Sequence, residues 1–165
     1  TVLDNVIVGN RLRTKSRLID AIFRTPRERR EEQESREKAM EMLDFVGLTH
    51  LADRQVALIS QEAKKRVAIA LALATDPKIV FLDEPAAGIN PEETDGLAEL
   101  MRKIVDNGIT VCTIEHKMQM IMSLADKIMV LNQGEKIAEG TPDEIKNDPV
   151  VIEAYLGGEA VVEID

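Results

Sequence analysis

The chain has no tryptophan, and aromatic residues make up only 2% of its 165 residues. Proteins that stack nucleotide bases need aromatic side chains, and the formal net charge of −9 opposes binding to a polyanion. We therefore expect no nucleic-acid partner. The single cysteine, Cys112, has no disulfide partner within the chain, which is typical of a reducing compartment. No apolar run is long enough to cross a bilayer.

The sequence also lacks the motif G-x-x-x-x-G-K-[ST]. Nucleotide-binding proteins use the backbone amides and the lysine of that loop to hold phosphates. These 165 residues alone are therefore expected neither to bind ATP tightly nor to hydrolyse it.

Two adjacent carboxylates follow an apolar run in the middle of the chain. Residues 79–82 read as a buried strand of a parallel sheet, Asp83 and Glu84 come next, and Pro85 ends the strand. Ligands of open α/β sheets bind at the carboxyl ends of such strands. Asp83 is suited to hold Mg²⁺, and Glu84 is suited to orient and deprotonate a water molecule. The alternative is a strand followed by an ordinary acidic turn.

Helical and strand patterns alternate along the chain, which predicts a parallel α/β sheet. The expected helices cover residues 1–10, 27–46, 61–75, 92–107, 117–124, 142–146 and 149–156. The expected strands cover residues 79–82 and 109–114, and a hairpin joins 127–131 to 135–138. Cys112 lies in the second strand, where we expect a small buried residue. An apolar set occupies residues 12–23, and the tail over 158–165 is expected to be loose.

Basic residues gather near the N-terminus, where ten of the 21 lysines and arginines lie between Arg11 and Lys38. Two interpretations stay open. The segment could face anionic headgroups or an acidic partner. Alternatively, it is a solvated helix face with ion pairs such as Arg30 with Glu34.

Several motifs occur in an order that resembles one known family. Residues 82–91 (LDEPAAGINP) resemble the Walker B motif and D-loop of an ATP-binding-cassette ATPase. Residues 110–116 (TVCTIEH) resemble the strand and switch histidine of that family, and residues 125–142 resemble the strand pair that follows. Residues 86–91, the arginine-rich N-terminal segment and the ending over 151–157 are similar to the ATP-binding subunits of branched-chain amino-acid importers.

The resemblance implies a P-loop NTPase-like α/β fold with a partial parallel sheet, flanking helices and a helical subdomain. The subdomain would cover residues 1–75, the α/β part 76–157 and the tail 158–165. Glu84 would be the general base, Asp83 the Mg²⁺ partner and His116 the sensor of the γ-phosphate. Ser60 and Asn90 would contact ATP, Asn90 as part of a D-loop that crosses to the opposite subunit. The alternative for Asn90 is a plain turn that leads into the helix at Glu92.

The segment that should carry the family's signature departs from the pattern. Residues 59–63 read Ile-Ser-Gln-Glu-Ala where the family has Leu-Ser-Gly-Gly-Gln or Leu-Ser-Tyr-Gly-Gln. Ser60 is kept, but Glu62 stands where a glycine would let the backbone approach a phosphate, and its charge would repel that phosphate. The alternative is an ordinary helix start, with Ser60 as the N-cap and Glu62 in the first turn.

The resemblance leaves two functions open. The first is an ATP-binding and hydrolysing subunit of an importer, with Mg²⁺, a second ATPase subunit and transmembrane permease subunits as partners. Such a subunit would be peripheral on the cytoplasmic face of the inner membrane and meet the membrane only through the permease. The family places the phosphate loop before the position of Thr1, so we expect this chain to be a C-terminal fragment. The second is a non-catalytic docking or dimerisation module.

Overall fold

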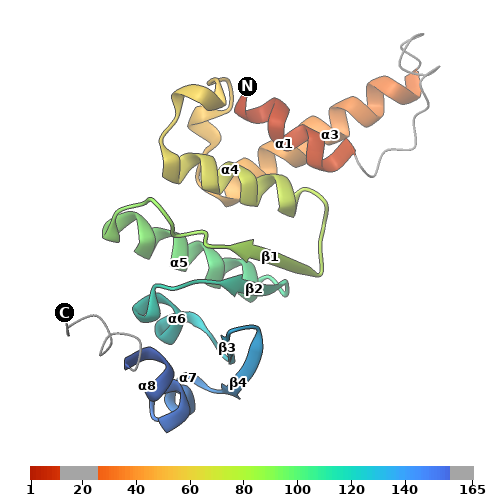
Figure 1. Cartoon of the computed structure of the whole chain (residues 1–165). Helices are drawn as coiled ribbons and strands as arrows, with labels where there is room; N and C mark the ends of the chain where they lie inside the picture. Colours follow the sequence, from red (N-terminus) through yellow and green to blue (C-terminus); the bar gives the residue numbers. More distant parts are fainter. Residues whose placement is uncertain (12–25, 157–165) are drawn as a thin grey trace. The chain divides into compact units, whose positions relative to one another are not determined.

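The computed structural model describes residues 1–11 and 26–156, which form two units (Figure 1). The first unit runs from Thr1 to Ile114, and the second begins at Glu115. The apolar set over 12–23 and the tail over 158–165 therefore lie outside the described residues, and the predicted domain boundaries stay a prediction. Every expected helix and strand in the described part is present, with ends within two residues of the expected ones.

Three helices form one layer of the first unit: α1 (Val2–Arg11), α3 (Pro26–Phe45) and α4 (Gln61–Leu73). The short 3₁₀ helices η1 (Thr49–Leu51) and η2 (Val56–Leu58) connect α3 to α4. α1 packs against both longer helices, and α3 packs against α4. Their buried residues recur at helical spacing, as expected of helices that cover a core. The buried positions include Val2, Leu3, Val6, Ala39, Met42, Leu43, Val67 and Ala70.

Cations from two other helices complete the C-terminal end of α3. Arg66 Nη1 donates to the carbonyl oxygen of Val46 at 3.2 Å, and Lys103 Nζ donates to that of Phe45 at 2.7 Å. The last carbonyls of a helix have no partner within it and carry a partial negative charge, so basic side chains stabilise them. Gly47, with φ of 77°, then turns the chain away.

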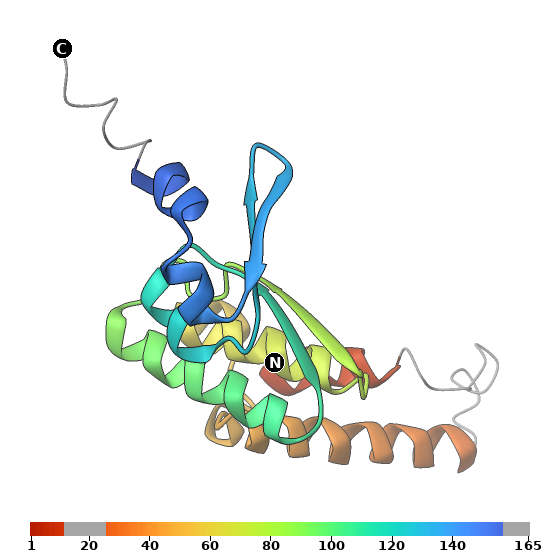
Figure 2. The ribbon, with the colours of Figure 1, turned by 90° about the horizontal axis from the view of Figure 1, so that it is seen from below.

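The second layer is a β-α-β unit made of β1 (Ile79–Asp83), α5 (Pro91–Asp106) and β2 (Thr110–Ile114). The strands are parallel, with Ile79 opposite Thr110 and Asp83 opposite Ile114. α5 contacts β2 and runs alongside the strands (Figures 1 and 2). The helix buries an apolar stripe, namely Leu97, Leu100, Met101 and Ile104. The predicted α/β architecture with a parallel sheet is confirmed.

One face of the strand pair is open to solvent, and this corrects the expectation for Cys112. Side chains alternate between the two faces of a strand, so Val80 is buried while Ile79, Phe81 and Ile114 are 44%, 73% and 66% exposed. Cys112 pairs with Phe81 and is exposed on the same face. The prediction of a buried Cys112 is therefore wrong, because continuous apolar strands are buried only where both faces of the sheet are covered.

The second unit contains α6 (Met118–Leu124), β3 (Ile128–Asn132), β4 (Glu135–Gly140), α7 (Pro142–Lys146) and α8 (Pro149–Leu156). β3 and β4 form the predicted antiparallel hairpin, seen in blue in Figure 2. Gln133 and Gly134, with φ of 50° and 86°, make its turn. α7 and α8 contact β4. None of the described helices is both long and apolar enough to cross a membrane.

Glu139 of β4 forms ion pairs with two lysines of the hairpin. Lys136 Nζ lies 2.7 Å from its Oε2, and Lys127 pairs with its other oxygen. Hydrogen bonds from these two ammonium groups, Lys127 first, lower the pKa of Glu139 from 4.5 to about 2. The hydrogen bond to Glu139 also raises the pKa of Lys127. Glu139 is therefore paired with one lysine of its own strand and with Lys127, which precedes β3.

Candidate functional site

The carboxyl end of β1 places two acidic side chains in solvent. Asp83 is the last residue of the strand, and both Asp83 and Glu84 are exposed, whereas Pro85 and Ala86 behind them are buried. The backbone N–H of Glu84 donates to the carbonyl of Ile114 at 2.9 Å, which continues the ladder by one step. The two carboxylates thus lie at the edge of the sheet where α/β proteins bind ligands.

Glu84 has an unusual backbone. Its φ is 43°, in the left-handed region that residues with a Cβ seldom adopt. The bond to Ile114 holds its N–H, and the N–H of Ala87 donates to its carbonyl oxygen at 3.0 Å. Strained conformations persist where the surroundings hold them, and they gather at functional sites. Asp76 and Gln133 also have positive φ, at 47° and 50°, so the backbone alone does not decide between an ordinary acidic turn and a functional corner, and the roles of Asp83 and Glu84 stay predictions.

A side chain that the sequence did not single out also reaches this corner. Lys65 Nζ, from α4, donates to the carbonyl oxygen of Glu84 at 3.2 Å. The two residues are 19 positions apart, and nothing local in the sequence links them. Only the packing of α4 near β1 brings them together.

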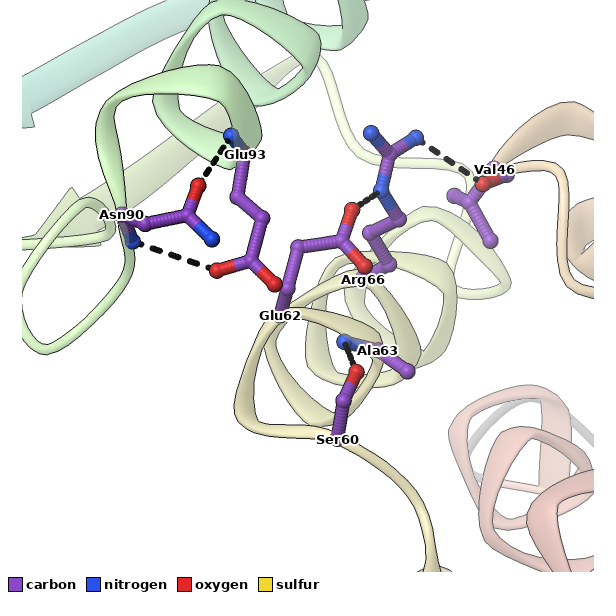
Figure 3. Close-up of polar contacts among 7 residues, drawn as sticks. All are labelled: Val46, Ser60, Glu62, Ala63, Arg66, Asn90 and Glu93. Atoms are coloured by element: carbon purple, nitrogen blue, oxygen red, sulfur yellow. Dashed lines mark hydrogen bonds and ion pairs between the residues drawn. The ribbon is translucent and has the colours of Figure 1, made fainter.

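Ser60 is the N-cap of α4, and its hydroxyl accepts a hydrogen bond from the N–H of Ala63 at 3.1 Å (Figure 3). Glu62, one residue into the first turn, forms an ion pair with Arg66. These two side chains are 19% and 20% exposed. The geometry matches the alternative of an ordinary helix start, and the charge of Glu62 is balanced within the same helix. A nucleotide contact by Ser60 stays a prediction.

Asn90 is the N-cap of α5 and takes part in a reciprocal capping box. Its Oδ1 accepts from the N–H of Glu93 at 2.8 Å, while its own N–H donates to Glu93 Oε2 at 3.2 Å (Figure 3). Pro91 occupies the first helical position. Local bonds therefore cap the start of α5, and the role of Asn90 toward a second subunit stays a prediction.

The helices capped by Ser60 and Asn90, α4 and α5, lie close together around Arg66. A Cβ added at Gly96 of α5 would stand 2.9 Å from Arg66 Nη2. Arg66 therefore bonds to Val46, which follows α3, and to Glu62 of its own helix, and it lies against Gly96 of α5. This contact sets the start of α4 against the start of α5.

His116 belongs to the second unit, where its side chain is exposed, and its role as a phosphate sensor stays a prediction. In the described residues, no three His, Cys, Asp or Glu side chains cluster as a metal cage. Mg²⁺ in phosphate-transfer sites keeps water and phosphate ligands and needs only one or two carboxylates. Asp83 fits that requirement as a single exposed oxygen ligand, whereas the residues that would hold phosphates are not recognisable in the sequence.

Comparison with known proteins agrees with these features. The profile of the ABC transporter family matches residues 4–87. The profile described as branched-chain amino acid ATP-binding cassette transporter matches residues 135–161.

Curated relatives extend the match over 95% of the chain. The branched-chain amino acid transport ATP-binding protein BraF of Pseudomonas aeruginosa is 41% identical over 158 residues. The corresponding protein LivG of Escherichia coli K12 is 40% identical over 158 residues. The chain spans 62% of the length of each of these relatives.

Solved structures of ATP-binding cassettes also match the fold over nearly the whole chain. An ATP-binding cassette of an ABC transporter in its ADP conformation superposes with a TM-score of 0.78 and 32% identity, over 95% of this chain and 63% of that one. A nucleotide-free ATP-binding cassette gives a TM-score of 0.77 and 34% identity, over 94% of this chain and 62% of that one. With its strand pair, its Asp83–Glu84 corner and its matches to these proteins, the chain belongs to the ABC transporter family of ATP-binding cassettes.

Proposed function

We propose that the protein to which these residues belong is the ATP-binding and hydrolysing subunit of an ABC importer for branched-chain amino acids. The observation that carries the proposal is the corner at the end of β1, where two exposed carboxylates follow a parallel strand and Glu84 is held in a left-handed conformation. The substrate class is supported by the names of the relatives, which are 40–41% identical and transport branched-chain amino acids.

Asp83, Glu84 and His116 have complementary tasks in this proposal. Asp83 would supply an oxygen ligand to Mg²⁺, and the charge of the bound ion would offset that of the phosphates. Glu84 accepts a proton from the water that attacks the γ-phosphate and keeps that water in line. His116 donates a hydrogen bond to the γ-phosphate. These assignments rest on the positions that the side chains take after their strands and on the resemblance of the motifs.

Ser60 and Asn90 are proposed to face ATP held by a second copy of the subunit. Both residues cap helix N-termini, where backbone N–H groups favour anions. The pairing of Glu62 with Arg66 reduces the repulsion that an isolated carboxylate would exert there. The complete subunit would bind transmembrane permease subunits and remain peripheral on the cytoplasmic face of the membrane.

One observation favours the second candidate, a non-catalytic docking or dimerisation module. Glu62 occupies the first turn of α4, and the Ser60 hydroxyl is already engaged by Ala63. The sequence has no G-x-x-x-x-G-K-[ST], so we infer that these 165 residues by themselves do not bind Mg-ATP tightly. Micromolar affinity of the isolated chain in calorimetric titration would refute that inference.

The substitution Glu84→Gln in the full-length protein, assembled with its permease, tests the proposal. General-base catalysis contributes about 10²- to 10⁴-fold to a rate, so we expect hydrolysis to fall by about that factor while ATP binding is kept. Asp95→Asn is the matched control, because Asp95 is an exposed carboxylate on α5. Unchanged hydrolysis in Glu84→Gln would reject Glu84 as the base. A wild-type complex without ATP turnover would favour the docking module.

A further inference from the structure

A hydrogen bond joins α4 directly to the corner that carries Glu84. Lys65 Nζ donates to the carbonyl oxygen of Glu84 at 3.2 Å. A charged donor makes a stronger hydrogen bond than a neutral one. Lys65 is half-buried on α4, and its ammonium reaches the carbonyl after β1 through a hydrogen bond that is itself exposed. The contact therefore connects two segments that are separate in the sequence and meet only in the fold.

The carbonyl of Glu84 belongs to a residue whose unusual backbone conformation depends on the hydrogen bonds that hold it. With φ of 43°, Glu84 turns the chain sharply between β1 and the segment that leads to α5. The N–H of Glu84 is held by Ile114 at 2.9 Å, and its carbonyl also accepts from Ala87 at 3.0 Å. These two are backbone bonds that no substitution removes cleanly. The hydrogen bond from Lys65 comes from a side chain, so a substitution can remove it. This bond orients the peptide group between Glu84 and Pro85.

We propose that Lys65 is a positioning residue that holds Glu84 in its left-handed conformation and couples α4 to the orientation of the Glu84 carboxylate. The inference rests on the proposed function of Glu84 as base. Lys65 follows Ser60 by five residues on the same helix, so a shift of the N-terminal half of α4 moves the ammonium and, through it, the Glu84 peptide. In this proposal Lys65 acts through the Glu84 peptide and is not itself a ligand of the water or the nucleotide.

Three variants of the full-length complex test the catalytic consequence. Lys65→Met removes the donor and keeps the apolar stem, Lys65→Arg restores a cationic donor, and Lys64→Met changes the neighbouring lysine. Lys64 makes no side-chain hydrogen bond in the described part of the chain, which makes it the matched control. We expect Lys65→Met to lower kcat for ATP about tenfold, the scale of one charge-assisted hydrogen bond. KM for Mg-ATP should stay within about twofold, since the bond positions the base rather than the nucleotide.

The conservative variant separates positioning from packing. Lys65→Arg should recover most of kcat, and Lys64→Met should keep it. Wild-type kcat in Lys65→Met would overturn the inference, and so would an equal loss in Lys64→Met or a rise in KM that accounts for the whole effect.

A second measurement does not depend on turnover. Amide hydrogen exchange of the nucleotide-free protein reports on the N–H groups of Glu84 and Ala87, which close the corner. We expect both amides to exchange faster in Lys65→Met and at the wild-type rate in Lys64→Met. A wild-type complex that does not hydrolyse ATP would defeat the proposed function, and exchange alone would then decide whether Lys65 holds the corner. Unchanged exchange in Lys65→Met would overturn the inference, whatever the rate of hydrolysis.

Discussion

The close packing of α1 on α4 depends on a glycine, and its replacement gives the sharpest stability prediction. A Cβ added at Gly9 would lie under 3.0 Å from the carbonyl oxygen of Leu71, which is closer than real Cβ atoms come to other heavy atoms. It would also stand 3.2 Å from the Leu71 carbonyl carbon and 3.3 Å from the Cβ of Ala74. The obstacle is backbone of α4, so the two helices must move apart to admit a methyl group.

Two opposing effects determine how much Gly9→Ala changes the free energy of unfolding. Overpacking a well-filled contact costs about 1–3 kcal/mol, and the upper part of that range applies because a backbone atom cannot rotate away. Alanine is a better helix former than glycine by about 1 kcal/mol. We therefore expect Gly9→Ala to lower the free energy of unfolding by about 1–2 kcal/mol. For a chain of this length that corresponds to a fall in Tm of roughly 2–8 °C.

Urea unfolding followed by the helical circular-dichroism signal measures this change. Val8→Ala is the control on the same helix, because Val8 is 56% exposed and its truncation should alter stability little. A Gly9→Ala variant as stable as the wild type would show that α1 and α4 are not in close contact at this position. A larger effect of Val8→Ala than of Gly9→Ala would refute the reasoning as well.

Two further predictions concern local bonds. Asn90→Ala removes the capping box of α5 and should cost about 1 kcal/mol of stability in urea unfolding, whereas Glu99→Ala on the exposed side of the same helix should cost little. Glu139 has a folded pKa of about 2 against an ordinary value of 4.5, so its stabilising effect is complete above pH 4.5 and is lost as the pH falls towards 2. Thermal unfolding of Glu139→Gln should therefore depend less on pH in that window than the wild type does. Glu135→Gln, on the same strand, is the control, and equal pH dependence in all three proteins would contradict the assignment.

The elements of this fold were predictable because their signals are local. Asn90 before Pro91 begins α5, Gly47 ends α3, and Gln133 with Gly134 turns the hairpin. Each signal acts through bonds between residues at most a few positions apart, such as the capping box of Asn90 and Glu93. The alternation of strand and helix then limited the sheet to a parallel one, and the apolar run over residues 79–82 placed the two carboxylates at the carboxyl end of a strand.

For the arginine-rich N-terminal segment, the sequence predicted the local ion pairs but left the role of the surface open. On α3 the interpretation as a solvated helix face is confirmed, because Arg30 pairs with Glu34 at 3.0 Å and Arg27 pairs with Glu31 at 3.3 Å. Both pairs have the i,i+4 spacing that the sequence displays. A role of this surface toward a membrane or a partner stays a prediction.

By itself, the sequence determined the order of helices and strands, the family and the position of Asp83 and Glu84 at a strand end, since all of these follow from neighbouring residues and their spacing. Only the tertiary structure decided that Cys112 is exposed, that Gly9 touches Leu71, that Arg66 caps α3 and that Lys65 holds the carbonyl of Glu84. These contacts join residues between 19 and 62 positions apart or depend on which face of a strand is covered. No local propensity encodes either property, because both arise from the packing of whole elements against one another.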